Sequence, residues 1–274
     1  MVVVLLWDNY SFTQLWSPFL LVFTISLGIL YTAVVGPYQH YVSNSTPVAK
    51  GKMLLFYLGL VLFYLSKGSP LDLIGHQYLF SAHMFQQALL YLFVPPLLLI
   101  GTPSWLIRWV IEKLLIKKLL QFFTHPLIAI MLFNVLFSFY HIPKIFDMMM
   151  INPVIGTIYQ VILFATSFLM WWPIIGPLPE MNRLSDLLKF AQIVGNGILL
   201  YPACALIILA DSVLYQSYVG VPQLFAFLPT LDDQQLGGVI MKIMQEIALG
   251  TALAYTFFQW VRKEKEKEEP EPIS

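Results

Sequence analysis

The sequence predicts an all-α integral membrane protein, a seven-transmembrane helical bundle, and three observations lead to this fold class. Hydrophobic residues make up 58% of the 274 residues and charged residues only 11%, whereas about 25% of the residues in soluble domains are charged. Apolar runs close to the roughly 20 residues that a helix needs to cross a bilayer recur along the chain. Basic residues gather in every second connection between these runs. The chain therefore has too few charges for a soluble globular surface.

Each predicted span is an apolar run that ends at glycine, proline or charged residues. No Lys or Arg precedes Lys50, so the first run lacks the basic segment of a signal peptide and is expected to be a retained span. The adjacent Pro95 and Pro96 lack backbone donors and predict a kink in the third span. The seven predicted spans are residues 15–35, 53–66, 77–100, 126–140, 154–175, 185–210 and 235–261.

Residues 104–123 differ in character from these spans. Arg108, Glu112, Lys113, Lys117 and Lys118 alternate at helical spacing with apolar residues. This pattern is typical of an amphipathic helix that lies in the membrane interface. We expect a single polytopic membrane domain over residues 1–262, followed by a charged tail over residues 263–274. The charge and the prolines of that tail predict disorder.

The distribution of charge predicts the orientation of the bundle. With the N-terminus outside, the cytoplasmic connections and the tail hold every basic residue except Lys67, Lys144 and Lys242. Cytoplasmic segments of membrane proteins carry such an excess of Lys and Arg. The sequence therefore predicts an N-terminus outside and a C-terminus inside, which agrees with an odd number of spans.

The few polar side chains within the spans collect toward the predicted outer side. Ionisable groups at membrane depth are costly and indicate function by default. His76 and His83 are seven residues apart, so on one continuous helix they would share a face with about 10 Å between them. Imidazole and thioether groups are copper ligands, and thioethers favour Cu(I). The predicted metal ligands are His83, Met84, His76, His141, Met241 and Met244, and the further polar candidates on that side are Asp72, Gln87, Asp233 and Gln234.

Each of these residues also has an ordinary structural interpretation. A buried histidine can simply form hydrogen bonds, and methionine is common in cores. Several other functions are excluded. The balance of 15 basic and 15 acidic residues excludes nucleic-acid binding through a basic surface, and the single Cys204 excludes a disulfide framework. Because the chain has no P-loop, His-Glu-x-x-His or Gly-x-Ser-x-Gly motif, we expect no catalytic activity.

Several segments of the sequence resemble the CtaG family of cytochrome c oxidase assembly factors, most closely its Bacillus-type branch. The resemblance covers roughly residues 15–260, and its motifs occur in the family's order. Its most specific part is the third predicted span, with His83-Met84 followed by a proline-terminated apolar run. The matching segments are residues 68–72, His76, residues 80–84 and 95–103, Asn134, residues 141–143, 171–177 and 233–238.

This resemblance implies an integral protein of the bacterial plasma membrane that assists the maturation of the caa(3)-type haem-copper oxidase. It implies copper as cargo, oxidase subunits and membrane lipid as partners, and an extracytoplasmic copper donor. The family motif often has a second histidine four residues after the first, where this chain has Gln87. Tyr159 and Gln160 occupy the region of the fifth span where further ligands are sometimes found. In this chain the pair His76 and His83 is then expected to substitute for the histidine pair of the family motif.

Three functions follow from these observations. The first is an assembly factor that holds or relays copper, as Cu(I), at the outer membrane face to the nascent oxidase. The second is a metal-free membrane scaffold or chaperone for an oxidase subunit, in which the histidines only pack. The third is a transporter of a small solute or metal, which the nearly apolar inner half of the spans disfavours.

Overall fold

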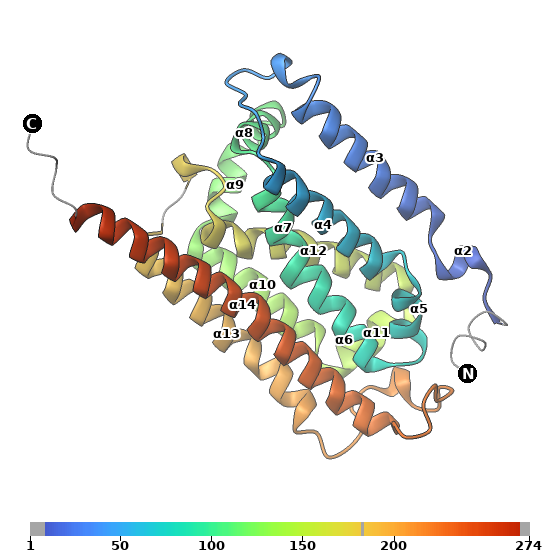
Figure 1. The fold of residues 1–274 in the computed structure, drawn as a ribbon. Coiled ribbons are helices and arrows are strands. Elements are labelled where there is room, and N and C mark those ends of the chain that lie inside the picture. The colour runs from blue at the N-terminus through green and yellow to red at the C-terminus, as the bar shows by residue number, and fades with distance from the viewer. Residues whose placement is uncertain (1–8, 182–183, 269–274) are drawn as a thin grey trace, which may run out of the picture.

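The computed structural model describes residues 9–181 and 184–268, and every regular element in these ranges is helical. The helices lie side by side in an elongated bundle (Figure 1). The long helices are α3 (Pro18–Val35), α4 (Lys50–Lys67), α10 (Pro126–Tyr140), α12 (Pro153–Ile175), α13 (Asp186–Ile208) and α14 (Thr230–Glu268). A further continuous helix joins α6 (Phe80–Ala88), the π-helical turn η2 (Leu89–Phe93) and α7 (Val94–Gly101).

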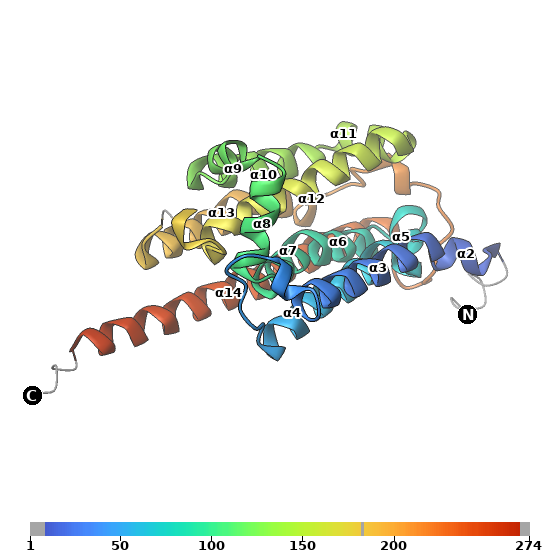
Figure 2. The same ribbon diagram turned by 90° about the horizontal axis from the view of Figure 1, so that it is seen from above.

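Shorter helices occupy the two ends of the bundle. One end, called here the α5 end, holds α2 (Phe12–Leu15), α5 (Pro70–Gln77), α11 (Pro143–Ile151) and η4 (Gln216–Tyr218). The other end, the α8 end, holds η1 (Gln39–Tyr41), α8 (Ser104–Lys113), α9 (Lys117–Phe123) and η3 (Pro179–Met181). Seen from above, α10, α12 and α13 form one layer and α3, α4, α6, α7 and α14 form the other (Figure 2).

Five of the described helices are long and apolar enough to cross a membrane. Two bent pairs raise this number to seven if each pair is one span: α4 with α5, bent by 41°, and α9 with α10, bent by 71°. The predicted spans match the observed helices closely. The predicted range 126–140, for example, is α10, with Pro126 at its first position. A proline is favoured there because the first helical N–H has no partner within the helix.

The helix from Phe80 to Gly101 changes its winding immediately before the two prolines. Pro95 cannot donate to the Tyr91 carbonyl four residues earlier. The indole Nε1 of Trp171 on α12 donates to that carbonyl instead, over 3.3 Å. The kink expected from Pro95 and Pro96 thus takes the form of a π turn whose free carbonyl is bound by a neighbouring helix.

Close helix contacts depend on small residues on α14. A Cβ atom on Gly237 would lie 2.6 Å from the Phe80 ring, and one on Gly238 would lie 2.8 Å from Ile208. These glycines therefore let α14 approach α6 and α13, as expected for small residues in membrane helix packing. Across the other layer, Asn134 of α10 donates to Asn196 of α13 over 2.9 Å.

The structure differs from the sequence prediction in three segments. The amphipathic segment 104–123 is two helices, α8 and α9, which meet near Leu115, a residue with a φ of 55°. The connection between the predicted spans 126–140 and 154–175 is mostly helix α11, begun by Pro143. Helix α14 continues to Glu268, so residues 263–268 of the predicted disordered tail are helical; alternating Lys and Glu are good helix formers. The rest of that tail lies outside the described residues.

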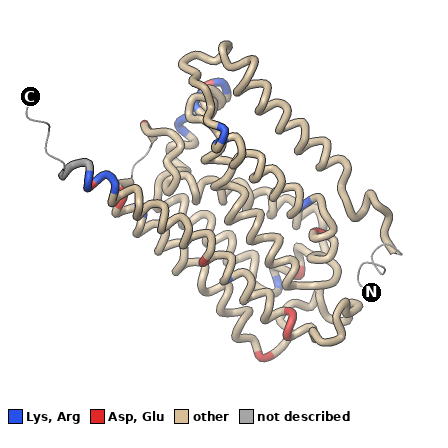
Figure 3. Tube along the Cα trace, in the orientation of Figure 1, with Lys and Arg blue, Asp and Glu red and all other residues tan. Residues whose placement is uncertain are grey.

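Charged residues are distributed unequally between the two ends (Figure 3). Lys and Arg mark α8, α9 and the C-terminal part of α14, whereas Asp residues mark the start of α14 at the opposite end. At the α8 end, the Arg108 guanidinium binds Glu180 of η3 through bonds of 2.7 and 3.0 Å. This ion pair fixes α8 to the connection between α12 and α13.

Candidate functional site

Two histidines from different helices meet at the α5 end of the bundle. His76 lies on α5 and His83 on α6, and their ring centroids are 4.9 Å apart with the ring planes at 86°. The prediction that both lie on one helix, about 10 Å apart, is wrong, because the chain breaks between Gln77 and Phe80. The break brings the two imidazoles into contact.

Gly75 makes this approach possible. A Cβ atom at Gly75 would lie 3.0 Å from both the backbone nitrogen and the Cα atom of His83. A backbone atom cannot move away as a flexible side chain can, so only glycine permits α5 to pack so closely against α6. The sequence pair Gly75-His76 thus places the close helix contact directly before the imidazole that meets His83.

Asp233 of α14 holds the start of α6. Its carboxylate accepts from the backbone nitrogen of Phe80 over 2.7 Å, from that of Ser81 over 3.3 Å, and also from the Ser81 hydroxyl. The first N–H groups of a helix lack partners within the helix, and the helix dipole favours a negative charge there. Asp233, predicted as a polar candidate, is therefore the cap of the helix that carries His83.

Gln234, the next predicted candidate, stabilises the segment before α14. Its side-chain oxygen accepts from the backbone nitrogen of Leu214 over 2.7 Å, and its amide nitrogen donates to the Ser212 carbonyl over 3.4 Å. Among the described residues, Gln234 forms no hydrogen bond with His76 or His83. Its role in this structure is to hold the α13–α14 connection.

The hydrogen bonds of His76 fix the positions of its protons. Its Nδ1 donates to the Asp72 carbonyl over 2.8 Å, and a carbonyl can only accept. In the neutral ring, Nε2 therefore keeps its lone pair. The amide nitrogen of Gln160 lies 3.4 Å from Nε2, while the amide oxygen of Gln160 accepts from Lys67 over 3.0 Å. Lys67 also pairs with Asp72 over 2.6 Å.

His83 is fully buried and has a different environment. Its Nε2 lies 3.1 Å from the Tyr140 hydroxyl of α10 and 3.0 Å from the amide nitrogen of Gln87. Its Nδ1 has no hydrogen-bond partner. Buried polar atoms are nearly always paired in proteins, so Nδ1 is the atom of this ring that the protein's own hydrogen bonds leave free.

His141 is buried beside this pair. Its Nδ1 donates to the Phe137 carbonyl over 2.7 Å, and its Nε2 has no partner. The His141 ring centroid lies 5.3 Å from that of Tyr140, which in turn lies 6.2 Å from that of His83. Across residues 9–181 and 184–268, no three His, Cys, Asp or Glu side chains converge closely enough to hold a metal ion. The site is therefore a histidine pair with a third imidazole nearby.

The predicted methionines lie along a different interface. Met84 is fully buried, and its Cγ would be 3.1 Å from a Cβ atom on Gly237 of α14. Met241 is buried in the same core cluster, and Met244 packs partly buried against it. Met84 is adjacent to His83 in sequence, but successive residues on a helix point about 100° apart, so its side chain packs toward α14.

Four residues of the site were not among the predicted candidates. Gln86 donates to the Ser66 carbonyl over 2.8 Å and also to Asp72, so Asp72 is surrounded by Lys67, His76 and Gln86. Buried polar side chains are rare in apolar helices and indicate function by default. This rarity could have identified these residues from the sequence. The four residues are Lys67, Gln86, Tyr140 and Gln160.

Comparison with known protein families shows to which family the chain belongs. The family model described as cytochrome c oxidase caa3 assembly factor (Caa3_CtaG) matches residues 22–263, which include the whole histidine site. The chain belongs to this CtaG family. No curated protein and no solved structure matches the chain. The resemblance that the sequence motifs indicated is confirmed.

Membership in the CtaG family and the apolar helices together identify a multi-pass protein of the bacterial plasma membrane. The family is one of oxidase assembly factors, which implies association with oxidase subunits. His76, His83 and the residues around them thus lie in a membrane protein that serves oxidase assembly.

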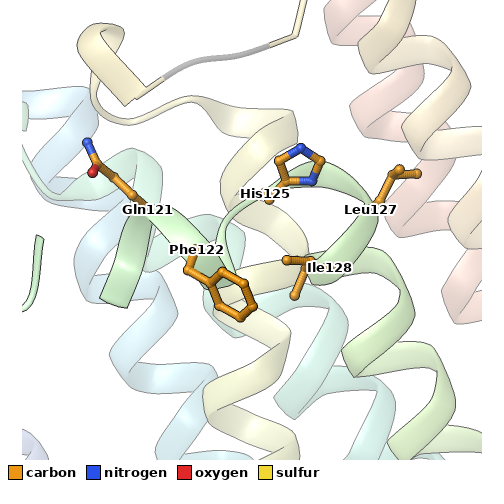
Figure 4. A pocket seen from close by; sticks show the side chains of 5 residues that line it. All are labelled: Gln121, Phe122, His125, Leu127 and Ile128. Carbon is orange, nitrogen blue, oxygen red and sulfur yellow. The ribbon is translucent and has the colours of Figure 1, made fainter. Parts of the chain in front are cut away.

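Two hollows of this CtaG-family chain lie elsewhere, at the bend between α9 and α10 (Figure 4). The second includes Gln192 of α13. The 15 residues of α10 separate His125, at one end of the helix, from His141, at the other. These hollows are mostly apolar and are separate from the histidine site; the first is lined by Gln121, Phe122, His125, Leu127 and Ile128.

Proposed function

We propose that this chain assists caa(3)-type oxidase assembly by holding Cu(I) as cargo at His76 and His83. The observation that carries the proposal is the contact of these two imidazoles, whose ring centroids are 4.9 Å apart. His76 keeps a lone pair on Nε2, and His83 has an unpartnered Nδ1. Imidazole is a suitable copper ligand. His141, with its own unpartnered Nε2, is a candidate ligand for transfer.

The proposed arrangement in the membrane has seven spans, with the N-terminus outside. Counting each bent pair as one span supports the number seven. The gathering of Lys and Arg at the α8 end supports a cytoplasmic location for that end, because cytoplasmic segments carry the excess of basic residues. In this orientation the histidine site faces the outside, where an extracytoplasmic copper donor and the nascent oxidase subunit would meet it.

A metal-free scaffold is the second candidate function. The observation that favours it is the hydrogen bonding of the cluster, in which Lys67, Asp72, His76 and Gln160 already form mutual bonds. Such a network can specify how helices pack without any ligand. In both proposals the chain acts on an oxidase subunit without catalysing a reaction.

Copper titration of the purified protein distinguishes the two functions. We expect about one Cu(I) per chain in the wild type, lost in His83→Ala and strongly weakened in His76→Ala. His125→Ala is the matched control, because His125 lies at the opposite end of α10. Unchanged copper binding in His83→Ala would contradict the ligand assignment. An absence of copper binding in the wild type would favour the scaffold.

A test in cells addresses the relay itself. In a strain that lacks this chain, added copper should partly restore oxidase activity if copper delivery is the missing step. His83→Asn should fail to support assembly at low copper but not at high copper. Full support by His83→Asn at low copper would indicate that the histidine serves only in packing.

A further inference from the structure

Gln87 occupies a position from which it can control His83. It is one helical turn after His83 on α6, is 2% exposed, and places its amide nitrogen 3.0 Å from His83 Nε2. The amide oxygen of Gln87 has no hydrogen-bond partner. A buried amide whose oxygen is unpaired lacks a group that would fix which of its two ends faces the histidine.

The end of the amide that faces Nε2 determines where the proton of a neutral His83 lies. An NH₂ group only donates, so Nε2 must accept and Nδ1 must carry the proton. A carbonyl oxygen only accepts, so Nε2 must carry the proton and Nδ1 has a free lone pair. The two states contain the same number of protons and differ by a rotation of the amide and a shift of one proton within the ring. A metal ion can bind Nδ1 only in the second state.

The other imidazoles of the site lack this freedom. His76 and His141 each donate from Nδ1 to a backbone carbonyl, at 2.8 and 2.7 Å, so their Nε2 lone pairs are fixed. The amide of Gln160 beside His76 is also fixed, because its oxygen accepts from the ammonium group of Lys67, which can only donate. Gln87 is thus the one amide at this pair that can present either end.

The remaining partner of His83 permits both states. The Tyr140 hydroxyl lies 3.1 Å from Nε2 and can donate or accept. In either orientation one end of the Gln87 amide stays unpaired, so one state is favoured in the metal-free chain by only a small difference in free energy. A ligand that binds the other state alone can reverse such a difference.

We propose that Gln87 selects the tautomer of His83 and thereby sets whether the site can accept a metal ion. In the metal-free chain its NH₂ group faces Nε2 and Nδ1 is protonated. When Cu(I) binds, the amide rotates and its oxygen accepts from Nε2–H, which orients the ligand as outer hydrogen-bond partners do in metal sites. The inference rests on the proposed copper site, and it adds a regulatory residue to it.

The test is ¹⁵N NMR of the histidine rings in the full chain in lipid nanodiscs, without metal and with Cu(I). The His83 signals are identified by their loss in His83→Ala. We expect the Nδ1–H tautomer in the metal-free wild type and the Nε2–H tautomer with Cu(I). In metal-free Gln87→Met, which keeps the volume but removes both amide ends, we expect a mixture of tautomers. The same single tautomer in wild type and Gln87→Met would overturn the inference.

Copper affinity gives a second readout. We expect Gln87→Met to raise the Cu(I) dissociation constant about 10- to 100-fold, the usual effect of losing an outer partner of a metal ligand, at unchanged stoichiometry. Gln87→Glu, whose carboxylate only accepts, should bind Cu(I) at least as tightly as the wild type. Gln245→Met is the matched control, because Gln245 is an equally buried amide on α14. Equal weakening in Gln87→Glu and Gln87→Met would overturn the selection by amide orientation.

The two proposals can fail separately. If the wild type binds no Cu(I), the copper function fails, while the tautomer of the metal-free chain still tests the role of Gln87. If copper binds at His76 and His83 but the tautomer does not depend on residue 87, only the regulatory inference fails.

Discussion

Tyr218 donates a 2.5 Å hydrogen bond to the backbone carbonyl of Gly75, the residue directly before His76. Tyr215, three residues earlier in the same connection, donates to the His141 carbonyl over 2.9 Å. Both tyrosines are buried, and Tyr215 stacks on Phe80 with ring centroids 4.6 Å apart. The α13–α14 connection therefore holds the two histidine-bearing turns at the α5 end from outside the helices themselves.

The first prediction follows from this contact. Tyr218→Phe removes the donor and leaves the buried Gly75 carbonyl unpaired, which costs about 1–3 kcal/mol. We expect a lower thermal midpoint and weaker Cu(I) binding, since His76 is held less firmly. Tyr41→Phe is the control, because Tyr41 is 75% exposed. Equal thermal midpoints and copper affinities in the two variants would contradict the positioning role.

The second prediction concerns the close approach of α5 and α6. Gly75→Ala places a methyl group 3.0 Å from the His83 backbone, so the two helices must separate. We expect Cu(I) affinity to fall at least 10-fold, measured by competition with a chelator of known affinity. Gly51→Ala is the control, since a Cβ atom there meets nothing within 4 Å. Full copper affinity in Gly75→Ala would show that the approach is not required.

The third prediction tests the cap of α6. Asp233→Ala removes the acceptor of the Phe80 and Ser81 backbone N–H groups, and loss of such a cap costs about 0.5–2 kcal/mol. We expect faster hydrogen exchange at the start of α6 and weaker copper binding. Asp233→Asn keeps an oxygen acceptor and should restore much of both properties. Equal changes of hydrogen exchange and copper binding in Asp233→Asn and Asp233→Ala would show that the loss of the cap is not their cause.

The fourth prediction concerns pH at the α8 end. The Arg108 guanidinium lowers the pKa of Glu180 below its usual value through their hydrogen bonds. A carboxylate with a lowered folded pKa contributes stability that is present above its unfolded pKa and lost as the pH falls through the folded pKa. Because the pair is solvent-exposed, the effect is small. The protection factors for hydrogen exchange in α8 should therefore fall modestly in acid. In Glu180→Gln they should be lowered already at neutral pH. If the same response to acid persists in Glu180→Gln, a titratable group other than Glu180 causes it.

The sequence predicted the long helices because local signals define them. The α10 range agrees at both ends, since Pro126 begins the helix and the apolar run ends at Tyr140. The break between α5 and α6 could not be predicted, because no proline or glycine lies between Gln77 and Phe80. The break is stabilised by Asp233, which caps Phe80 from 153 positions away.

The candidate site was predicted only in part for the same reason. His76, His83, Asp72 and Gln87 do meet, and His141 lies beside them. Met84 was predicted with the histidines because it lies on the same predicted outer side and its thioether favours Cu(I), but it packs against Gly237. Which face of α6 meets α14 depends on the packing of both helices, and a single sequence does not contain that information in a local pattern.

The proposed Cu(I) site consists of His76 and His83 and does not include the methionines. X-ray absorption at the copper edge of the Cu(I)-loaded full chain tests it most directly, because nitrogen and sulfur ligands scatter differently. We expect a first shell of imidazole nitrogens alone, with that shell lost in His83→Ala and unchanged in Met84→Leu. A sulfur ligand that disappears in Met84→Leu would contradict the assignment.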